Sequence, residues 1–136
     1  MDTFKLNVYG GSQTGNGRIY KAEDFINSPT KDAIQNNSLF VYVSAPGLVN
    51  PSLCNLSGVV KDIRLEDDNI IVDVVWKNTP SGMHIQNLRE QFWDRFYDII
   101  GLSPVGIGYV SPEGIVTDYR LLFLEASMLP VGQKPI

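Results

Sequence analysis

Residues 57–76 read SGVVKDIRL, EDDN and IIVDVVW, and this stretch decides the fold class. The four polar residues at 66–69 are typical of a turn between two strands. In the second arm the apolar residues occupy alternate positions from Ile70 to Trp76, while Asp73 falls on the opposite face. This alternation indicates a strand with one buried face. The sequence therefore predicts a β-hairpin over residues 57–65 and 70–76.

Further strands are predicted on both sides of this hairpin. Residues 3–9 alternate with period two, and residues 39–44 are rich in residues that favour strands. Residues 105–110 and 115–124 flank a Ser-Pro-Glu-Gly turn, which predicts a second hairpin.

Two helices are expected between these strands. Ser28 followed by proline predicts a helix that is capped at Ser28 and runs to about Asn36. Helical spacing of apolar residues predicts a longer helix from Pro80 to Ile100, capped by Thr79 and stopped by Gly101.

The order of elements predicts a β-rich α+β fold rather than a purely βαβ architecture. We expect a small closed or partly open β-barrel with one long helix and one or two short helices outside. The barrel is expected to be a single domain over residues 1–128, followed by an extended tail at 129–136 that contains two prolines and a glycine.

Composition excludes several classes of function. The chain has 136 residues and a net charge of -4, without a basic run, so it is a poor candidate for binding nucleic acid. It has one Cys and one His, which excludes a disulfide framework and a Cys/His zinc site. No apolar run is long enough to span a membrane, and the N-terminus lacks the apolar stretch of a signal peptide. We expect no cofactor and no metal.

Residue patterns alone do not identify a nucleophile, a base and a residue that orients the base. His84, the single imidazole, stands near the start of the long predicted helix, where a surface or packing role is the simplest interpretation. Cys54 has no basic neighbour to lower its pKa, so a buried and inert thiol is expected.

Four segments taken together resemble the tailed-phage prohead maturation proteases, from about residue 5 to residue 127. Residues 15–20, GNGRIY, are similar to that family's Asn-Gly-Arg-Ile/Val-Tyr signature. Residues 41–46 lie where the family has its Gly-Glu-x-x-His-Pro motif, and residues 57–82 match its Gly-Val-Val … Asp-Thr-Pro-x-Gly passage. Residues 101–108, followed by a closing strand from Gly114, match its Gly-Ile/Val-Ser-Ser-Arg-Gly motif. The resemblance implies a compact β-barrel ringed by helices, shared with the herpesvirus assembly proteases.

The chain departs from the family at the residues that the resemblance marks as catalytic. Ala45 stands at the position of the catalytic His, and an alanine cannot take a proton. Ser103 is the candidate nucleophile, but Pro104 and Val105 replace the Ser-Arg that follows it in the family. If the nucleophile corresponds to the second Ser of that motif, Pro104 has replaced it. Asp118 is the nearest acidic candidate for the third member of a triad. Ala45 has two explanations: a natural loss of the base, or a deliberate replacement that traps an inactive form.

Three interpretations of function follow. The first is a catalytically inactive protease-fold protein that is a structural component of a tailed-phage particle, associated with the head or capsid. The second is a prohead maturation serine protease that cleaves scaffold and capsid proteins, represented here by an inactive form. The third is a peptide-binding adaptor in capsid assembly, with the sheet edge at residues 39–44 as the expected place for the peptide. We expect the protein in the virion after synthesis in the host cytoplasm, with capsid or other virion proteins as partners in an oligomer or larger assembly.

Overall fold

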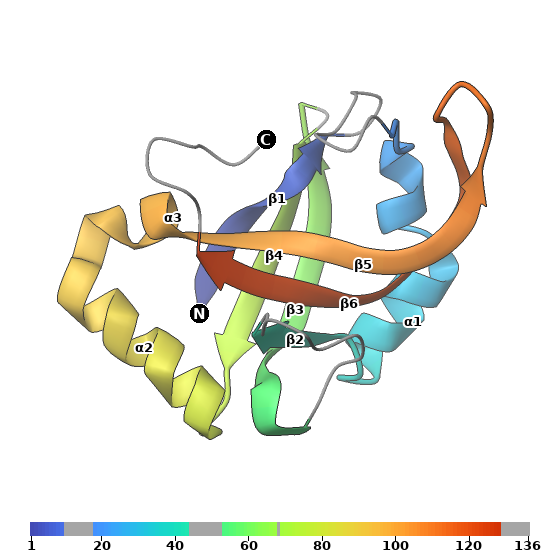
Figure 1. Ribbon diagram of the computed structural model, residues 1–136. Helices are drawn as coiled ribbons and strands as arrows, with labels where there is room; N and C mark the ends of the chain where they lie inside the picture. The colour runs from blue at the N-terminus through green and yellow to red at the C-terminus, as the bar shows by residue number, and fades with distance from the viewer. Residues whose placement is uncertain (10–17, 44–52, 68, 129–136) are drawn as a thin grey trace.

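The computed structural model describes residues 1–9, 18–43, 53–67 and 69–128 (Figure 1). Its strands are β1 (Asp2–Tyr9), β2 (Phe40–Val43), β3 (Leu56–Glu66), β4 (Asn69–Trp76), β5 (Ile100–Val110) and β6 (Val116–Met128). Its helices are α1 (Ser28–Gln35), α2 (Pro80–Phe92) and α3 (Phe96–Ile99), with short 3-10 turns η1 (Ala22–Phe25), η2 (Leu53–Asn55) and η3 (Trp93–Arg95). The expected tail at 129–136 lies outside the described residues.

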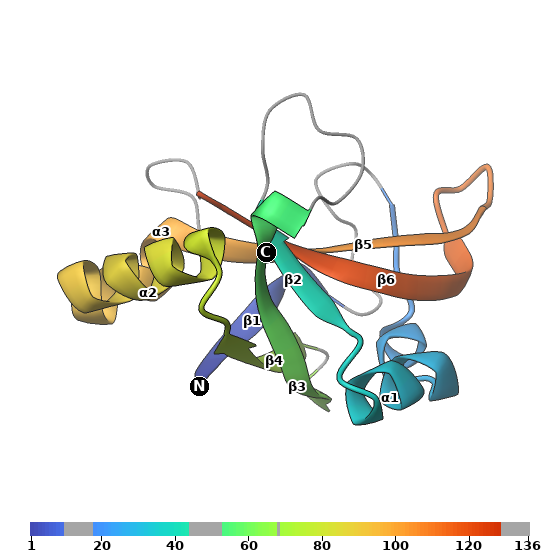
Figure 2. The same cartoon turned by 90° about the horizontal axis from the view of Figure 1, so that it is seen from below.

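The six strands form a closed barrel in the order β1-β4-β3-β2-β6-β5. Neighbouring strands are antiparallel except for the pairs β1–β5 and β2–β6, which are parallel. Figure 2 shows β2 lying between β3 and β6. The predicted β-rich barrel with helices outside is therefore confirmed, and the barrel is closed rather than partly open.

The hairpin predicted over residues 57–76 forms β3 and β4. Ile70, Val72 and Val74 are fully buried in the barrel, as the alternation requires. Directly after β3, Asp67 takes a left-handed backbone conformation with φ 50°, which aspartate tolerates better than most residues. Burial of this one face fixes the register of the hairpin, since a slip of one residue would expose it.

The long helix predicted over residues 80–100 is instead broken at Trp93. Its start is as predicted: Thr79 Oγ1 accepts the Gly82 N–H at 3.0 Å, and Pro80 takes the first position. At Trp93 the backbone turns to φ 47°, which ends α2. The break lets α3 turn Phe96 into the core, where its ring packs 5.8 Å from the ring of Phe4. Gly101, predicted to stop the helix, belongs to β5.

The shorter helix α1 is also displaced slightly at its start. Asn27, not Ser28, is the N-cap, and its Oδ1 accepts the Thr30 N–H at 3.2 Å. Asn27 also donates to the Tyr119 carbonyl at 3.3 Å, so the cap attaches α1 to β6. Among the described residues, no helix is long and apolar enough to cross a membrane.

The buried carboxylate of Asp2 holds α2 and α3 against the barrel. The Trp76 indole N–H donates to its Oδ2 at 2.6 Å, and the Tyr97 hydroxyl donates to its Oδ1 at 2.9 Å. Arg89 Nε lies 2.7 Å from the same Oδ1. The Asp2 side chain is only 2% exposed. Burial and the hydrogen bond to Asp2 raise the pKa of Tyr97, so the phenol stays a donor over the whole physiological range.

A second carboxylate, Asp73, links β1, β3 and β4 on the outer face. The Thr3 hydroxyl donates to Asp73 Oδ1 at 2.6 Å, and Arg64 Nη1 lies 2.9 Å from Oδ2. The hydrogen bond from Thr3, followed by the bond and charge of Arg64, lowers the pKa of Asp73 although partial burial opposes the shift.

We expect Asp2→Ala to lower the free energy of unfolding by about 2–4 kcal/mol, because Trp76 and Tyr97 would lose their acceptor and Arg89 its counter-charge. Chemical denaturation measures this difference. Asp32→Ala, at an exposed position on α1, is the control and should change stability by no more than about 0.5 kcal/mol. Equal effects of the two substitutions would contradict a structural role for Asp2.

We expect Asp73→Asn to lower the free energy of unfolding by about 1–2 kcal/mol near neutral pH. The pKa of Asp73 in the folded protein lies below the unfolded value of about 3.9. The ionised carboxylate therefore stabilises the folded state above that pH. This stabilisation is lost as the pH falls through the lowered pKa. The difference in free energy of unfolding between wild type and variant should therefore disappear below about pH 4. Denaturation curves across pH test this, with the more exposed Asp62→Asn as control. A gap that stays constant down to about pH 2 would show that the charge is not responsible.

Candidate functional site

Three polar side chains form a row across β5, β6 and β2 on the outer face of the barrel. Ser103 lies opposite Glu125, and Glu125 pairs in turn with Tyr42. Paired residues on neighbouring strands project from the same face of a sheet. The adjacent residues on the three strands, Leu102, Leu124 and Val41, are buried in the core. The row therefore faces away from the core, and all three of its side chains are half-buried.

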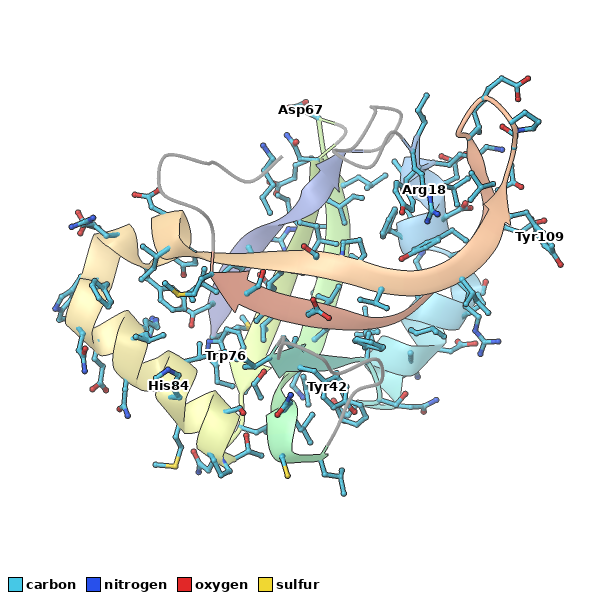
Figure 3. The ribbon with its side chains drawn as sticks, viewed as in Figure 1. Arg18, Tyr42, Asp67, Trp76, His84 and Tyr109 are labelled. Atoms are coloured by element: carbon cyan, nitrogen blue, oxygen red, sulfur yellow. The ribbon has the colours of Figure 1, made fainter. Side chains whose placement is uncertain are left out.

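Aromatic rings support one end of this row. The ring of Tyr42 packs edge-on against Phe123 at 5.4 Å and against Phe40 at 6.3 Å between centroids. Figure 3 shows Tyr42 on β2, which is one of the strands of the barrel. These contacts fix the ring of Tyr42 on the face of the sheet that Glu125 also occupies.

Glu125 is the acidic residue that the structure brings to Ser103, and the sequence analysis missed it. An undistorted hairpin would set Phe123 opposite Ser103. Two register irregularities, next to Val105 and to Ile107, each add one residue to β6 and move Glu125 into that place. Glu125 lies one residue beyond the strand predicted at 115–124, so no sequence pattern pointed to it.

Asp118, the predicted third member, is not brought together with Ser103. It belongs to the second irregularity of β6, is exposed, and has a left-handed backbone with φ 52°. Seven residues separate it from Glu125, which corresponds to roughly 23 Å along an extended strand. An aspartate is favoured at such a bulge because it tolerates this conformation.

Ala45, where the family resemblance places the missing base, lies outside the described residues, and β2 ends at Val43. His84 is exposed on α2 (Figure 3). It borders a pocket of about 300 Å³ at the end of the barrel, together with Val43 and Ser127. The rest of the lining is apolar: Ile85, Leu88, Ile100, Ala126 and Met128. The single imidazole thus belongs to the helical layer and not to the three strands that carry the row.

A larger pocket, of about 450 Å³, lies beside the far half of β5. It is lined by the strand from Pro104 to Gly108, by Arg18 and by the rings of Tyr20 and Tyr119. Burial, and the nearby Tyr20, raise the pKa of Tyr119. A side chain at Gly106 would meet the Tyr119 ring, because its Cβ would lie 2.6 Å from Cζ. The glycine of the Ser-Pro-Val-Gly stretch is therefore explained by packing.

The strand edges differ from what the peptide-binding interpretation expected. β2 pairs with β3 on one side and with β6 on the other, so the described part of the strand predicted at 39–44 offers no free edge. Within the described parts of the chain, β1 pairs with β5 only through Leu6 and Leu102. From Val105 onward, the edge of β5 that faces β1 has no strand partner among those residues.

Cys54 is exposed in η2 and not buried as expected. Its carbonyl accepts the hydroxyl of Ser81 at 3.0 Å, which joins η2 to the start of α2. Among the described residues, no group of three or more His, Cys, Asp and Glu side chains could hold a metal ion.

No family model and no curated protein sequence matches this chain. The chain is similar in structure to the bacteriophage T4 capsid assembly protease, gp21, with a TM-score of 0.68 and 17% sequence identity. The match covers 91% of this chain and 79% of that protein. At this identity the likeness shows the fold, and it confirms the barrel that the resemblance implied.

Proposed function

We propose that this chain is a protease-fold protein without peptidase activity that serves as a structural component of a tailed-phage particle, on the head. The fold is shared with a phage capsid assembly protease, which supports a place in capsid assembly. Capsid or other virion proteins are then the partners. Because a fold does not determine a function, the proposal rests on the residues of the outer row.

The observation that carries the proposal is the position of the only imidazole. A serine peptidase needs a base that removes the hydroxyl proton as the carbonyl is attacked, and imidazole serves because its pKa lies near neutrality. The row at Ser103 offers Glu125 and Tyr42 instead. A carboxylate is a far weaker base than imidazole, and a phenol is protonated near neutral pH.

Pro104, the residue after the candidate nucleophile, also argues against peptidase chemistry. Backbone N–H groups next to a nucleophile commonly stabilise the oxyanion that forms on the attacked carbonyl. Proline has no N–H to donate. The row therefore lacks an imidazole base, and its neighbouring backbone lacks one donor.

A maturation protease seen in an inactive form is the second candidate. Ala45 stands where the related proteases have their histidine, and Ser103 with an acidic neighbour, Glu125, remains in place. This candidate requires that histidine at position 45 restore the missing proton acceptor.

A peptide-binding adaptor is the third candidate, and the edge of β5 supports it better than β2 does. The edge beyond Val105 is without a strand partner among the described residues and lies beside the pocket that contains Arg18. An extended peptide added there would bond to the main chain of β5.

For a structural component, we expect the chain in stoichiometric, multi-copy amounts in purified mature particles of the phage that encodes it. Quantitative mass spectrometry of virions measures its ratio to the major capsid protein. Its absence from mature particles would overturn the proposal, whereas its presence in empty precursors alone would favour the protease.

We expect Ala45→His to give no cleavage when the variant is co-expressed with the phage's scaffold and capsid proteins. Gel analysis of the substrates reads the outcome, and circular dichroism confirms that the variant is folded. The controls are the double variants that add Ser103→Ala or His84→Ala. Cleavage by the single variant that disappears with Ser103→Ala would establish the protease in place of our proposal.

A further inference from the structure

A small aromatic notch lies on the helical layer, on elements separate from the outer row. It encloses about 200 Å³ and is lined by Arg89, Glu90, Trp93 and Tyr97. Figure 1 shows α2 and α3, which flank it, standing out at one side of the barrel, away from α1. Tryptophan, tyrosine and arginine are the residues most enriched where binding energy is concentrated in protein interfaces.

Trp93, at this notch, has a backbone conformation that is unfavourable for a tryptophan. Its φ of 47° is in the left-handed region, where a bulky side chain is unfavourable. The side chain is 78% exposed, so burial in the core does not compensate for this strain. A glycine would end α2 in this conformation without the penalty. The use of tryptophan here therefore points to a role outside the fold.

Two of the other lining residues, Arg89 and Tyr97, are held in position by Asp2. The Tyr97 hydroxyl and Arg89 Nε both bind Asp2 Oδ1, at 2.9 and 2.7 Å. The positive charge of Arg89 is thereby paired within the protein, and its position is set. Walls that are already in place do not have to be ordered when a ligand enters.

The charged side chains of residues 90–98, on the two turns that form the notch, are mostly negative. Glu90 lies in its lining, and Asp94 and Asp98 are exposed in the following turns. Arg95 is the one exposed cation between them. An exposed indole beside a carboxylate attracts a cation through the electron-rich ring and through the ion pair.

We propose that this notch binds an arginine side chain on an extended, basic segment of a partner protein. The guanidinium stacks on the Trp93 indole, and Glu90 accepts its N–H groups. Arginine fits better than lysine because its planar group can stack on a ring while it forms two parallel hydrogen bonds to a carboxylate.

The test uses the full chain and two peptides, acetyl-Gly-Gly-Arg-Gly-Gly-amide and the same peptide with uncharged citrulline in place of arginine. NMR titration follows the backbone amide signals of Glu90 and Tyr97. We expect saturable shifts with the arginine peptide, about fivefold weaker binding of the citrulline peptide, and about fivefold weaker binding of arginine by Glu90→Gln. Equal affinity for both peptides, or no saturable shift, would overturn the proposal.

A second variant separates binding from folding. Trp93→Gly should remove binding of the arginine peptide and raise the Tm, because glycine relieves the left-handed strain. Tyr109→Ala is the matched control, since Tyr109 is a 73% exposed aromatic residue on the β5–β6 hairpin (Figure 3), and it should leave peptide affinity unchanged. Retained binding by Trp93→Gly, or a lowered Tm, would assign Trp93 a purely structural role and overturn the proposal.

Discussion

The carboxylate of Asp2 is the interaction on which the arrangement of helices and barrel depends. It lies at the start of β1 and receives donors from β4 and α3 and the guanidinium of α2, so four elements meet at one buried side chain. A buried anion is costly unless its hydrogen bonds and charge are satisfied, and here they are satisfied only when α2 and α3 are docked. The same contacts set the walls of the aromatic notch. The binding surface that we propose is thus a direct result of how the N-terminal strand is anchored.

The geometry of the outer row depends on irregularities in one hairpin. Each extra residue in β6 bends the strand and shifts which side chains meet across it. Glu125 faces Ser103 because of these two bulges, and Asp118 is left at the far end as a bulge residue. A residue that looks catalytic in the sequence can therefore have a conformational role, and the true neighbour of Ser103 depends on the strand register.

The barrel could be predicted from the sequence because alternation and turn chemistry are local signals. The hairpin at residues 57–76 and the Thr79 cap need only neighbouring residues to be recognised. The break at Trp93 could not be predicted, because no glycine or proline marks it and it is the burial of Phe96 against Phe4 that favours it. Nor could the pairing of Ser103 with Glu125 be predicted, since it depends on where the two irregularities of β6 fall in the strand register. The expectation that Ala45 replaces a catalytic base came from the family resemblance and not from periodicity.

The closed barrel has a consequence for the order in which the chain can fold. β3–β4 and β5–β6 are hairpins between neighbouring strands, whereas β1 must find β4 and β5, and β2 must find β6. Contacts between residues as distant as Val41 and Leu124 carry a large loop-closure cost, which makes folding slow relative to helical proteins of this size. During synthesis on the ribosome β1 and β2 can pair early with β4 and β3, but their second partners, β5 and β6, emerge only near the end of the chain. The edges of β1 and β2 that still lack these partners are then the part of the nascent chain most prone to aggregation, and a chaperone would act on them first.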